Sequence, residues 1–394
     1  MRTTTFRDVL LEEIAEIKSG VGFPISMQGC ESGDFPFAKV GDISNRARSG
    51  EQFISDAPNW VKNEDLSTLK FTPFPTGTIV FAKIGEAIRQ NFRAVSTRPM
   101  LFDNNVMGVI PQEERVDTTY LYFYLRTLDF YHLAGKTTVP AIRKSTIEKL
   151  KIPLPPLEEQ RRIAAILDKA DGVRRKRKEA IRLTEELLRS TFLEMFGDPV
   201  TNPKGWEVSP FGSLGKLDRG KSKHRPRNDP SLLGGKYPLI QTGDVANSKG
   251  VIKKYTQTYS DKGLAQSRMW PAGTLCITIA ANIAQTGILT FDSCFPDSIV
   301  GFKPNNRVTT EYIQAWLGFL QPLLEDLAPQ SAQKNINLQM LRELDVPVPP
   351  IDLQSKFSEF VERIGNNSRN YEKSEAVMDN LFNSLLQKAF RGEL

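Results

Sequence analysis

The amino-acid sequence predicts an α+β protein: two related α/β-type domains, separated by two long helices that pair as an antiparallel coiled coil. The main observation is an internal repeat in a chain of 394 residues. The segment LKIPLPPLEEQ at 150–160 returns as LDVPVPPIDLQ at 344–354, an offset of 194 (344 − 150). Each copy opens a long polar segment with helical spacing. A repeat near half the chain length predicts a molecule with two-fold pseudo-symmetry.

The repeat extends into the region before each joint. The matching segments are 14–20 with 214–220, 35–43 with 237–245, 75–80 with 271–276, and 116–121 with 308–313. Their offsets vary between 192 (308 − 116) and 202 (237 − 35), so insertions and deletions separate the anchors. We expect buried strands and turns at the anchors and loops between them. Two copies of one scaffold with different loops can acquire two specificities.

The predicted domain borders follow from this layout. Short β-type runs and frequent Gly and Pro characterise residues 1–152, and residues 199–346 repeat the pattern. The prolines at 153–156 block helix propagation, so a first helical segment is expected over 153–198 and its copy over 347–394. Acidic residues in the first turn after the first joint suit the positive end of a helix dipole.

Each helical segment carries a narrow apolar stripe, which requires a partner surface. The stripes consist of Ile163, Leu167, Ala170, Ile181, Leu188 and Met195 in the first segment and Phe357, Val361, Ile364, Tyr371, Met378, Leu381 and Leu385 in the second. A helix of about 35 residues would reach roughly 50 Å. Two-fold symmetry predicts antiparallel pairing of the two helices. The alternative is two helical tails that pack on their own domains.

Bulk composition narrows the class of protein. The net charge of +6 and the pI near 9.0 mildly favour an anionic partner. Cys30, Cys276 and Cys294 are too few and too scattered for a disulfide framework or a zinc site, so no metal is expected. No apolar run approaches a membrane span and no signal-peptide core is present. A cytoplasmic protein without a membrane partner is the expectation.

Residues 215–222, GKLDRGKS, match the Walker A pattern of ATP-binding proteins. The basic residues that follow have no apolar face, so the helix of a phosphate-binding loop is not expected there. The favoured interpretation is a basic loop in which Lys221, Lys223, Arg225 and Arg227 approach DNA phosphates. A solvated surface loop and an ATPase site are the alternatives.

Catalytic constellations are missing from the sequence. Adenine methylation requires an Asn/Asp-Pro-Pro-aromatic motif, but Leu157 and Ile351 follow the prolines of the two joints. Asp297 follows a proline as in some nucleases, yet the residues after it supply no second carboxylate. Only His132 and His224 are available for histidine chemistry. The sequence therefore predicts a binding subunit without catalytic residues.

Duplex DNA is the commonest two-fold pseudo-symmetric target, and base reading needs Arg or Lys for guanine and Asn or Gln for adenine. In the first domain the candidates are Arg46, Arg48, Lys83, Arg89, Gln90, Arg93, Arg143 and Lys144, and in the second they are Gln241, Lys249, Arg268, Asn282, Gln285, Gln333, Lys334 and Asn335. Residues 83–93 and 280–285 follow matching strands, and residues 137–144 match 331–335, so these segments should share one face. For each residue the alternative is an ordinary surface position. For 174–178 the open roles are a DNA phosphate contact, a partner contact and a solvated helix face.

Two variable domains, each followed by a Pro-Leu-Pro-Pro-type joint and a long helix, resemble the specificity subunit of type I restriction-modification enzymes. The joints at 152–160 and 346–351 carry this resemblance, with support from GTIV at 77–80 and GTLC at 273–276. It implies two target-recognition domains that read a split sequence in double-stranded DNA. It also implies two methyltransferase subunits and motor-nuclease restriction subunits as partners. Those partners would bind S-adenosylmethionine, ATP and Mg, and no cofactor is expected in this chain.

The second joint departs from the first, because Asp352 and Leu353 stand where the first copy has Glu158 and Glu159. Identical partner docking by the two copies is therefore in doubt. A rival interpretation is a two-headed assembly scaffold that binds proteins without reading DNA. Positive charge on matched faces would favour DNA reading, and acidic or apolar patches there would favour the scaffold.

Overall fold

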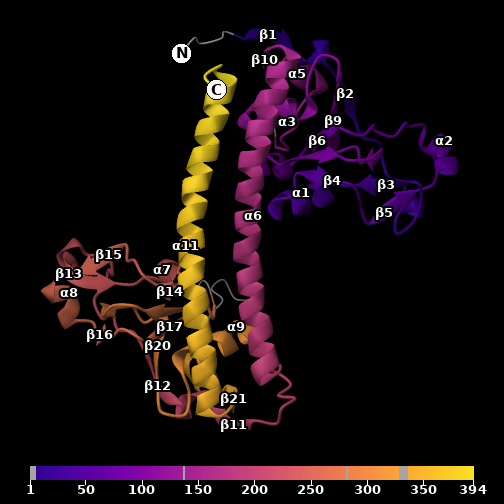
Figure 1. Cartoon of the computed structure of the whole chain (residues 1–394). Coiled ribbons are helices and arrows are strands. Elements are labelled where there is room, and N and C mark those ends of the chain that lie inside the picture. The colour runs from indigo at the N-terminus through magenta and orange to yellow at the C-terminus, as the bar shows by residue number, and fades with distance from the viewer. Residues whose placement is uncertain (1–5, 136–137, 281–282, 328–335) are drawn as a thin grey trace. The chain divides into compact units, whose positions relative to one another are not determined.

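The computed structural model describes residues 6–135, 138–280, 283–327 and 336–394. Its contacts divide the chain into two compact units, whose elements are labelled in Figure 1. Unit 1 comprises Met1–Ile181 and Asn370–Leu394, and unit 2 comprises Arg182–Arg369. The helices α6 (Leu157–Phe196) and α11 (Ile351–Phe390) each contribute one part to each unit.

The described residues of unit 1 form three sheets. The five-stranded sheet has the order β2 (Ala15–Ser19), β9 (Val106–Pro111), β6 (Ile79–Ala82), β7 (Arg93–Ser96) and β4 (Phe53–Ile54). A smaller sheet has the order β5 (Asn59–Val61), β3 (Phe35–Ala38) and β8 (Leu101–Phe102). The third pairs β1 (Arg7–Leu10) with β10 (Lys151–Leu154), which immediately precedes α6. The β1–β10 pair therefore brings the two ends of the first domain together.

Short helices complete unit 1. They are α1 (Val40–Arg48), α2 (Leu66–Leu69), α3 (Thr118–Thr127), α4 (Phe130–Leu133) and α5 (Lys144–Glu148). The Asp117 carboxylate accepts a hydrogen bond from the Tyr120 amide and so caps α3. This cap fixes the start of the helix against which both long helices of the unit pack.

Unit 2 repeats this topology. Its five-stranded sheet has the order β12 (Gly215–Arg219), β20 (Ile299–Pro304), β17 (Leu275–Thr278), β18 (Thr286–Leu289) and β14 (Gly250–Ile252). The smaller sheet gains one strand, in the order β15 (Gln257–Tyr259), β13 (Leu233–Leu239), β19 (Ser293–Cys294) and β16 (Met269–Trp270). The strands β11 (Glu207–Pro210) and β21 (Asp345–Val348) form the closing pair. The helices are α7 (Thr242–Ala246), α8 (Asp261–Ala265), α9 (Thr310–Leu327) and α10 (Leu338–Arg342).

The two joints are held by the same buried hydrogen bonds. Gln160, 1% exposed, accepts from the Asp117 amide at 2.9 Å and donates to the carbonyls of Pro155 at 2.8 Å and Arg115 at 3.2 Å. Gln354, 0% exposed, accepts from the amide of Thr309 at 2.9 Å and donates to the carbonyls of Pro349 at 2.8 Å and Arg307 at 3.0 Å. Each glutamine therefore ties the start of a long helix to its own domain.

A tyrosine adds a second tie in each copy. The Tyr120 hydroxyl donates to the Pro153 carbonyl at 2.5 Å, and the Tyr312 hydroxyl donates to the Pro347 carbonyl at 2.6 Å. Burial raises the pKa of both phenols, so they remain hydrogen-bond donors at neutral pH. Side chains thus donate hydrogen bonds to the carbonyls of the joint, whose prolines have no backbone N–H to donate.

In each unit the long helices pack on each other and on the domain. In unit 1, Ile163 and Leu167 of α6 share a core with Phe382 of α11 and Phe123 of α3. Arg174 of α6 also pairs with Asp379 of α11 at 2.5 Å, and Arg162 donates to the carbonyl of Leu394 at 2.9 Å, so the helices run antiparallel here.

In unit 2, the aromatic rings of Phe192 and Phe196 surround Tyr312 and Phe357. Phe192 and Phe196 belong to α6, Tyr312 to α9 and Phe357 to α11. The predicted α+β fold with two related domains and long helices is confirmed. The two alternatives for the helices hold together, because each helix contacts both the other helix and a domain.

The stripe residues lie at different depths. Ala170 and Leu385 pack against the core of unit 1, and Met195 and Val361 pack against that of unit 2. The remaining half-buried stripe residues are Ile181, Leu188, Ile364 and Met378. The side chain of Tyr371 lies outside the described part of the structure.

One predicted stripe residue is wrong. Leu381 is 49% exposed, and its neighbour Phe382, 2% exposed, takes the inward position. The aromatic ring of Phe382 fits beside Phe123, at 5.9 Å between ring centroids, and this tertiary contact sets the inward face. Stripe periodicity alone does not resolve adjacent apolar residues.

We predict that Gln160→Leu destabilises the joint of unit 1. Leucine fills the space but leaves the buried Asp117 amide without an acceptor, which costs about 1–3 kcal/mol. Amide hydrogen exchange at Asp117 should become faster. The midpoint of the unfolding curve should also fall. The control is Gln387→Leu, an exposed glutamine on α11. Equal effects of the two substitutions would contradict the role of Gln160.

Candidate nucleic-acid interface

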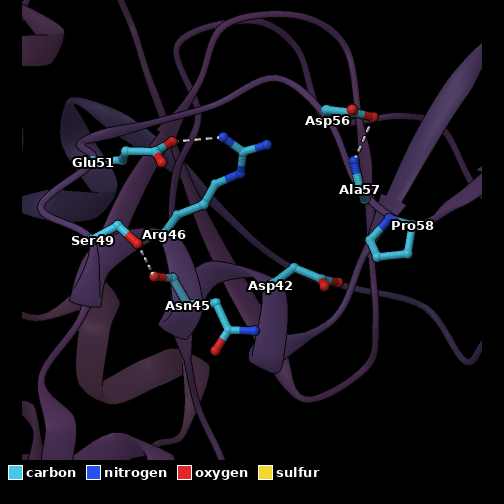
Figure 2. A pocket seen from close by; sticks show the side chains of 8 residues that line it. All are labelled: Asp42, Asn45, Arg46, Ser49, Glu51, Asp56, Ala57 and Pro58. Atoms are coloured by element: carbon cyan, nitrogen blue, oxygen red, sulfur yellow. Dashed lines mark hydrogen bonds and ion pairs between the residues drawn. The ribbon is translucent and has the colours of Figure 1, made fainter. Parts of the chain in front are cut away.

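Arg46, Arg48 and Gln90 gather around the C-terminal end of α1. Arg46 pairs with Glu51 at 2.8 Å, and Figure 2 shows this pair at a surface hollow of about 500 Å³. The hollow also contains the carboxylates of Asp42 and Asp56, so its charge disfavours a phosphate. Arg48 donates to Gln90 Oε1 at 2.9 Å. Arg48 and Gln90, both exposed, form a coupled polar pair of the kind that can read a base edge.

Lys83 follows β6 and is partly buried. Its Nζ donates to Ser19 Oγ at 3.0 Å, and burial lowers its pKa, while the nearby Asp103 carboxylate raises it. Burial in turn raises the pKa of Asp103. Lys83 is therefore held by polar neighbours and is only partly exposed to solvent.

Arg89 is exposed and oriented by its neighbours. It pairs with Glu86 at 2.9 Å, donates to the Tyr131 hydroxyl at 2.6 Å and lies over the Tyr131 ring at 4.0 Å. The hydrogen bond from Arg89 to Glu86 raises the pKa of the guanidinium. These contacts hold the cation at the surface, where a phosphate or a base could meet it.

The prediction that Arg93 contacts DNA is wrong. Arg93 is 4% exposed, and its guanidinium donates to the carbonyls of Asn91 at 2.6 Å and Leu128 at 2.8 Å. It also lies over the Phe130 ring at 3.9 Å. Burial, together with the charge of Arg126, lowers the pKa of Arg93 to about 9. Arg93 is thus a core residue that satisfies backbone carbonyls.

Two predicted segments of the first domain lie side by side. The Gly85 amide donates to the Pro140 carbonyl at 2.8 Å, and the Ile142 amide donates to the Lys83 carbonyl at 2.8 Å. Arg143 and Lys144 continue this segment at the start of α5, both exposed, and Lys144 pairs with Glu148 at 3.4 Å. The loop after β6 and the segment before α5 therefore form one surface.

The second domain contains the equivalent backbone contact. The Ile336 amide donates to the Ile279 carbonyl at 3.0 Å, directly after β17. Gln285 is half-buried near this point, and its backbone amide donates to Thr278 Oγ1 at 3.1 Å. The candidates Asn282, Gln333, Lys334 and Asn335 lie outside the described residues.

The basic loop at 221–227 is not a phosphate-binding loop of the Walker type, because residues Gly215–Arg219 form strand β12. Lys221 and Lys223 are exposed. Arg225 and Arg227 both pair with Asp297, the former at 3.5 Å. The loop therefore presents two lysines for an anion, and its two arginines share the single carboxylate of Asp297, which leaves one positive charge uncompensated.

Internal contacts order this loop. The Gln266 side chain accepts from the amides of Lys223 at 2.6 Å and His224 at 3.0 Å. Asp229 accepts hydrogen bonds from Ser231 and from His224, and these bonds lower its pKa to about 2. An ordered loop loses less conformational entropy when it binds.

The remaining candidates of the second domain differ in exposure. Arg268 is half-buried over the Trp270 ring at 3.8 Å and pairs with Asp218 at 3.4 Å. Lys249 is exposed at a residue with a φ of 50°. Gln241 donates to Gln257 Oε1 at 3.0 Å. Gln241 and Arg268 are both half-buried, so Lys249 is the most exposed of these three candidates.

Sequence reasoning missed Lys39, which occupies the position of Gln241 in the first domain. The offset of 202 (241 − 39) was the available signal. In both copies the backbone amide donates to an aspartate that starts the next helix, Lys39 to Asp42 at 2.7 Å and Gln241 to Asp244 at 2.8 Å. One backbone geometry thus presents lysine in one domain and glutamine in the other.

Within the described ranges, no three His, Cys, Asp or Glu side chains gather as a metal site. The same residues include no helix that is long and apolar enough to cross a membrane.

Comparison with known proteins decides the family. The family model of the type I restriction modification DNA specificity domain matches twice, over residues 4–183 and 203–377. The chain belongs to this family. Family members of this kind are generally non-catalytic specificity subunits.

Relatives resemble the chain over nearly its whole length. The MjaIX specificity subunit of Methanocaldococcus jannaschii is 22% identical, covering 98% of this chain and 92% of that protein. The EcoBI specificity subunit of Escherichia coli is 21% identical, covering 98% and 85%. The crystal structure of the S subunit from M. genitalium shares the fold with a TM-score of 0.62, at 15% identity, covering 99% of this chain and 98% of that one.

We predict that substitutions of Arg93 and Arg143, both in the first domain, differ in their effect on the free energy of unfolding. Arg93→Met removes donors from buried carbonyls and should lower the free energy of unfolding by about 1–3 kcal/mol. Arg143→Met, at an exposed position, should change it by less than about 0.5 kcal/mol. Urea unfolding of the two variants measures both. A neutral Arg93→Met would show that this guanidinium is not structural.

Proposed function

We propose that this chain is the DNA sequence-specificity subunit of a type I restriction-modification complex and that each domain reads one half of a bipartite duplex target. The observation that carries the proposal is the duplication of one specificity-domain scaffold with different side chains on matching loops. A split DNA site is the natural partner of two linked reading domains.

Base reading falls to exposed or half-buried side chains on these loops. In the first domain Arg48, Gln90 and Arg143 have the donors and acceptors that suit guanine and adenine. In the second domain Gln241 has the amide that suits adenine, and Lys249 has a donor that suits guanine. Each of these side chains would contact a bound duplex.

Phosphate contacts fall to the ordered basic loop. Lys221 and Lys223 are exposed, and the loop backbone around them is held by Gln266. Neutralising phosphates would add a salt-dependent contribution to affinity without sequence information. Arg225 and Arg227 share the carboxylate of Asp297, so together they would contribute one further positive charge.

Catalysis belongs to partner subunits in this proposal. Two methyltransferase subunits would bind S-adenosylmethionine and methylate adenine N6, and restriction subunits would use ATP and Mg to move and cleave DNA. This chain would supply recognition and docking surfaces in the cytoplasm and would bind no cofactor itself.

The two joints support unequal docking of these partners. Glu159 pairs with Arg162 at 2.7 Å on the surface of α6. At the equivalent position of α11, Leu353 packs against the core of unit 2. One helix start presents an ion pair where the other presents an apolar residue.

The rival function, a scaffold that does not read DNA, is not favoured. It accounts for the duplicated frame, but not for membership of a DNA specificity family. The described residues of the reading surfaces also carry basic and amide side chains.

A domain exchange tests the proposal. Residues 1–152 are replaced by the corresponding domain of another specificity subunit, and the hybrid is expressed with its methyltransferase subunits. Methylome sequencing should show one half of the methylated sequence changed and the other retained, because residues 199–346 are untouched. A change in both halves, or in neither, would argue against independent reading.

A further inference from the structure

Two matching loops, one in each domain, differ in charge. The loop after β2 begins at residue 21, and the loop after β12 begins at residue 221. Residues 221–232 contain four Lys or Arg side chains and one carboxylate, whereas residues 21–32 contain no Lys or Arg and one carboxylate. At an offset of 200, the second domain replaces Val21, Phe23, Ile25 and Met27 with Lys221, Lys223, Arg225 and Arg227.

The two loops leave the scaffold through the same backbone contacts, because the first two amides of each donate to carbonyls of a neighbouring segment. The donor–acceptor pairs are Gly20–Val106 at 3.0 Å and Val21–Phe102 at 2.9 Å in the first domain, and Gly220–Ile299 at 2.8 Å and Lys221–Phe295 at 3.0 Å in the second. A Cβ on Gly20 would lie 2.0 Å from the Asp103 carbonyl oxygen, and one on Gly220 would lie 2.3 Å from that of Pro296. Both loops therefore start from equivalent backbone positions that require glycine.

The first loop turns its apolar side chains inward. Val21, Phe23 and Met27 pack on the small core that contains Phe37, and the rings of Phe23 and Phe37 stack at 3.8 Å between centroids. Ile25 is the exception, since it is 87% exposed. At the position that matches Arg225, the first domain thus presents an uncharged side chain to solvent.

Two cations beside the first loop are tied to it. Lys39 Nζ donates to Gln28 Oε1 at 3.0 Å. Arg98 donates to the Asp34 carbonyl at 3.2 Å and lies 5.0 Å from the centroid of the Trp60 ring. These contacts order the first loop without giving it a cation of its own.

The second loop turns its cations outward. Ser222 is 6% exposed, and Lys221 and Lys223 on either side of it are exposed. Ser267 Oγ donates to the Lys221 carbonyl at 2.8 Å, and Arg225 donates to the Ser222 carbonyl at 2.7 Å. The loop backbone is therefore held from inside while the two lysines face solvent.

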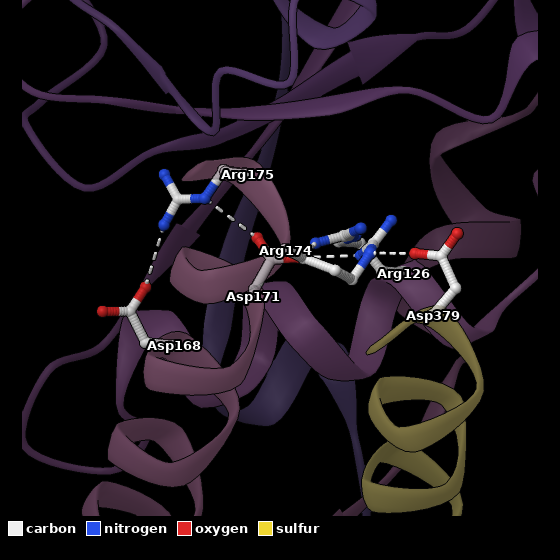
Figure 3. Close-up of polar contacts among 6 residues, drawn as sticks. All are labelled: Arg126, Asp168, Asp171, Arg174, Arg175 and Asp379. Carbon is white, nitrogen blue, oxygen red and sulfur yellow. Dashed lines mark hydrogen bonds and ion pairs between the residues drawn. The ribbon is translucent and has the colours of Figure 1, made fainter. Parts of the chain in front are cut away.

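The other basic run of the chain has a different role. The sequence left residues 174–178 open among DNA, partner and solvent. Figure 3 shows that the Asp171 carboxylate pairs with Arg174 at 2.8 Å, Arg175 at 3.2 Å and Arg126 of α3 at 3.4 Å. Arg174 also pairs with Asp379 at 2.5 Å. These arginines stabilise the helices of unit 1, and they leave the loop after β12 as the basic run whose lysines flank a buried serine.

We propose that the loops after β2 and β12 approach the DNA backbone at equivalent positions of the two half-sites, and that only the loop after β12 holds that backbone by charge. The second domain then supplies at this position a sequence-independent grip that the first domain lacks. This inference rests on the proposed function and deepens it, because it assigns this part of the affinity for DNA of any sequence to one domain.

The physical consequence is a salt dependence that is distributed unequally. Each phosphate that a cation neutralises releases condensed counterions, so affinity falls as salt concentration rises. The logarithm of the affinity falls with the logarithm of the salt concentration by about 0.9 per neutralised phosphate. An uncharged side chain at the same place, such as Ile25, releases no counterion.

The test measures the DNA affinity of the full chain together with its methyltransferase subunits. The probe is a labelled duplex without the methylated sequence, and fluorescence anisotropy follows binding across a series of salt concentrations. The double variant Lys221→Gln and Lys223→Gln should make the logarithmic salt slope shallower by about 1.8, since two phosphate contacts are lost.

The matched control is the double variant Lys216→Gln and Lys303→Gln. It removes the same charge from two exposed lysines of the same domain. They stand opposite each other on β12 and β20, at the end of β12 that is farther from the loop. The control should keep the wild-type slope. Equal slopes for the loop variant and this control would overturn the proposal.

A gain of charge tests the first loop. Ile25→Lys places a cation at the position that matches Arg225, and the exposure of Ile25 lets the substitution leave the core intact. The salt slope should become steeper by about 0.9. Ile25→Gln, which is polar but uncharged, is the control and should keep the wild-type slope. An unchanged slope for Ile25→Lys would show that this loop does not approach the DNA backbone, contrary to the proposal.

Methylome sequencing and thermal unfolding by circular dichroism complete the test. Phosphate contacts carry no sequence information, so every variant should methylate the wild-type sequence in both halves. A changed half-site in the Lys221→Gln and Lys223→Gln variant would mean that these lysines read bases, which the proposal excludes. If that variant does not fold, Ile25→Lys decides the question, because it leaves the second loop intact. A wild-type complex that binds no duplex DNA would instead refute the proposed function, so the two failures are distinguishable.

Discussion

The structure depends on the buried hydrogen bonds of Gln160 and Gln354. Each amide side chain satisfies one backbone amide and two carbonyls at the point where a proline-rich strand turns into a long helix. A buried group of this kind is costly to leave unpaired, so the angle between strand and helix is fixed. Because both copies use the same bonds, each domain is attached to its helix in the same way, whatever its loops contain.

This separation of frame and loops explains how one chain can carry two specificities. The closing strand pair, the five-stranded sheet and the joint recur in both units with the same strand order. Lys39 and Gln241 show the consequence at one position, since equivalent backbone amides bond to equivalent aspartates while the side chains differ in chemistry. Reading chemistry can therefore diverge without disturbing the core.

Much of the fold could be predicted from the sequence, because the repeat marks its own anchors. The joint, the paired domains and the long helices follow from the duplicated motifs. The inward position of Phe382, the burial of Arg93 and the ion pairs of Asp171 could not be predicted. Each depends on residues that are distant in sequence, such as Phe123, Leu128 and Arg126, and periodicity carries no information about those partners.

For the same reason, the sequence could predict only in part which candidate residues are accessible to DNA. Arg143 is exposed, whereas Arg93 is buried against backbone carbonyls. Arg225 forms an ion pair with Asp297, whereas Lys223 is exposed. We propose, as the central claim, that the two long helices set the spacing of the half-sites while the loops set their sequence. It is tested most directly by inserting one heptad after Ile181 in α6 and one after Arg369 in α11, where each helix passes from one unit to the other. Methylome sequencing should then show unchanged half-sites and a spacer longer by about three base pairs, from roughly 10.5 Å of added helix. Altered half-sites with an unchanged spacer would contradict the account.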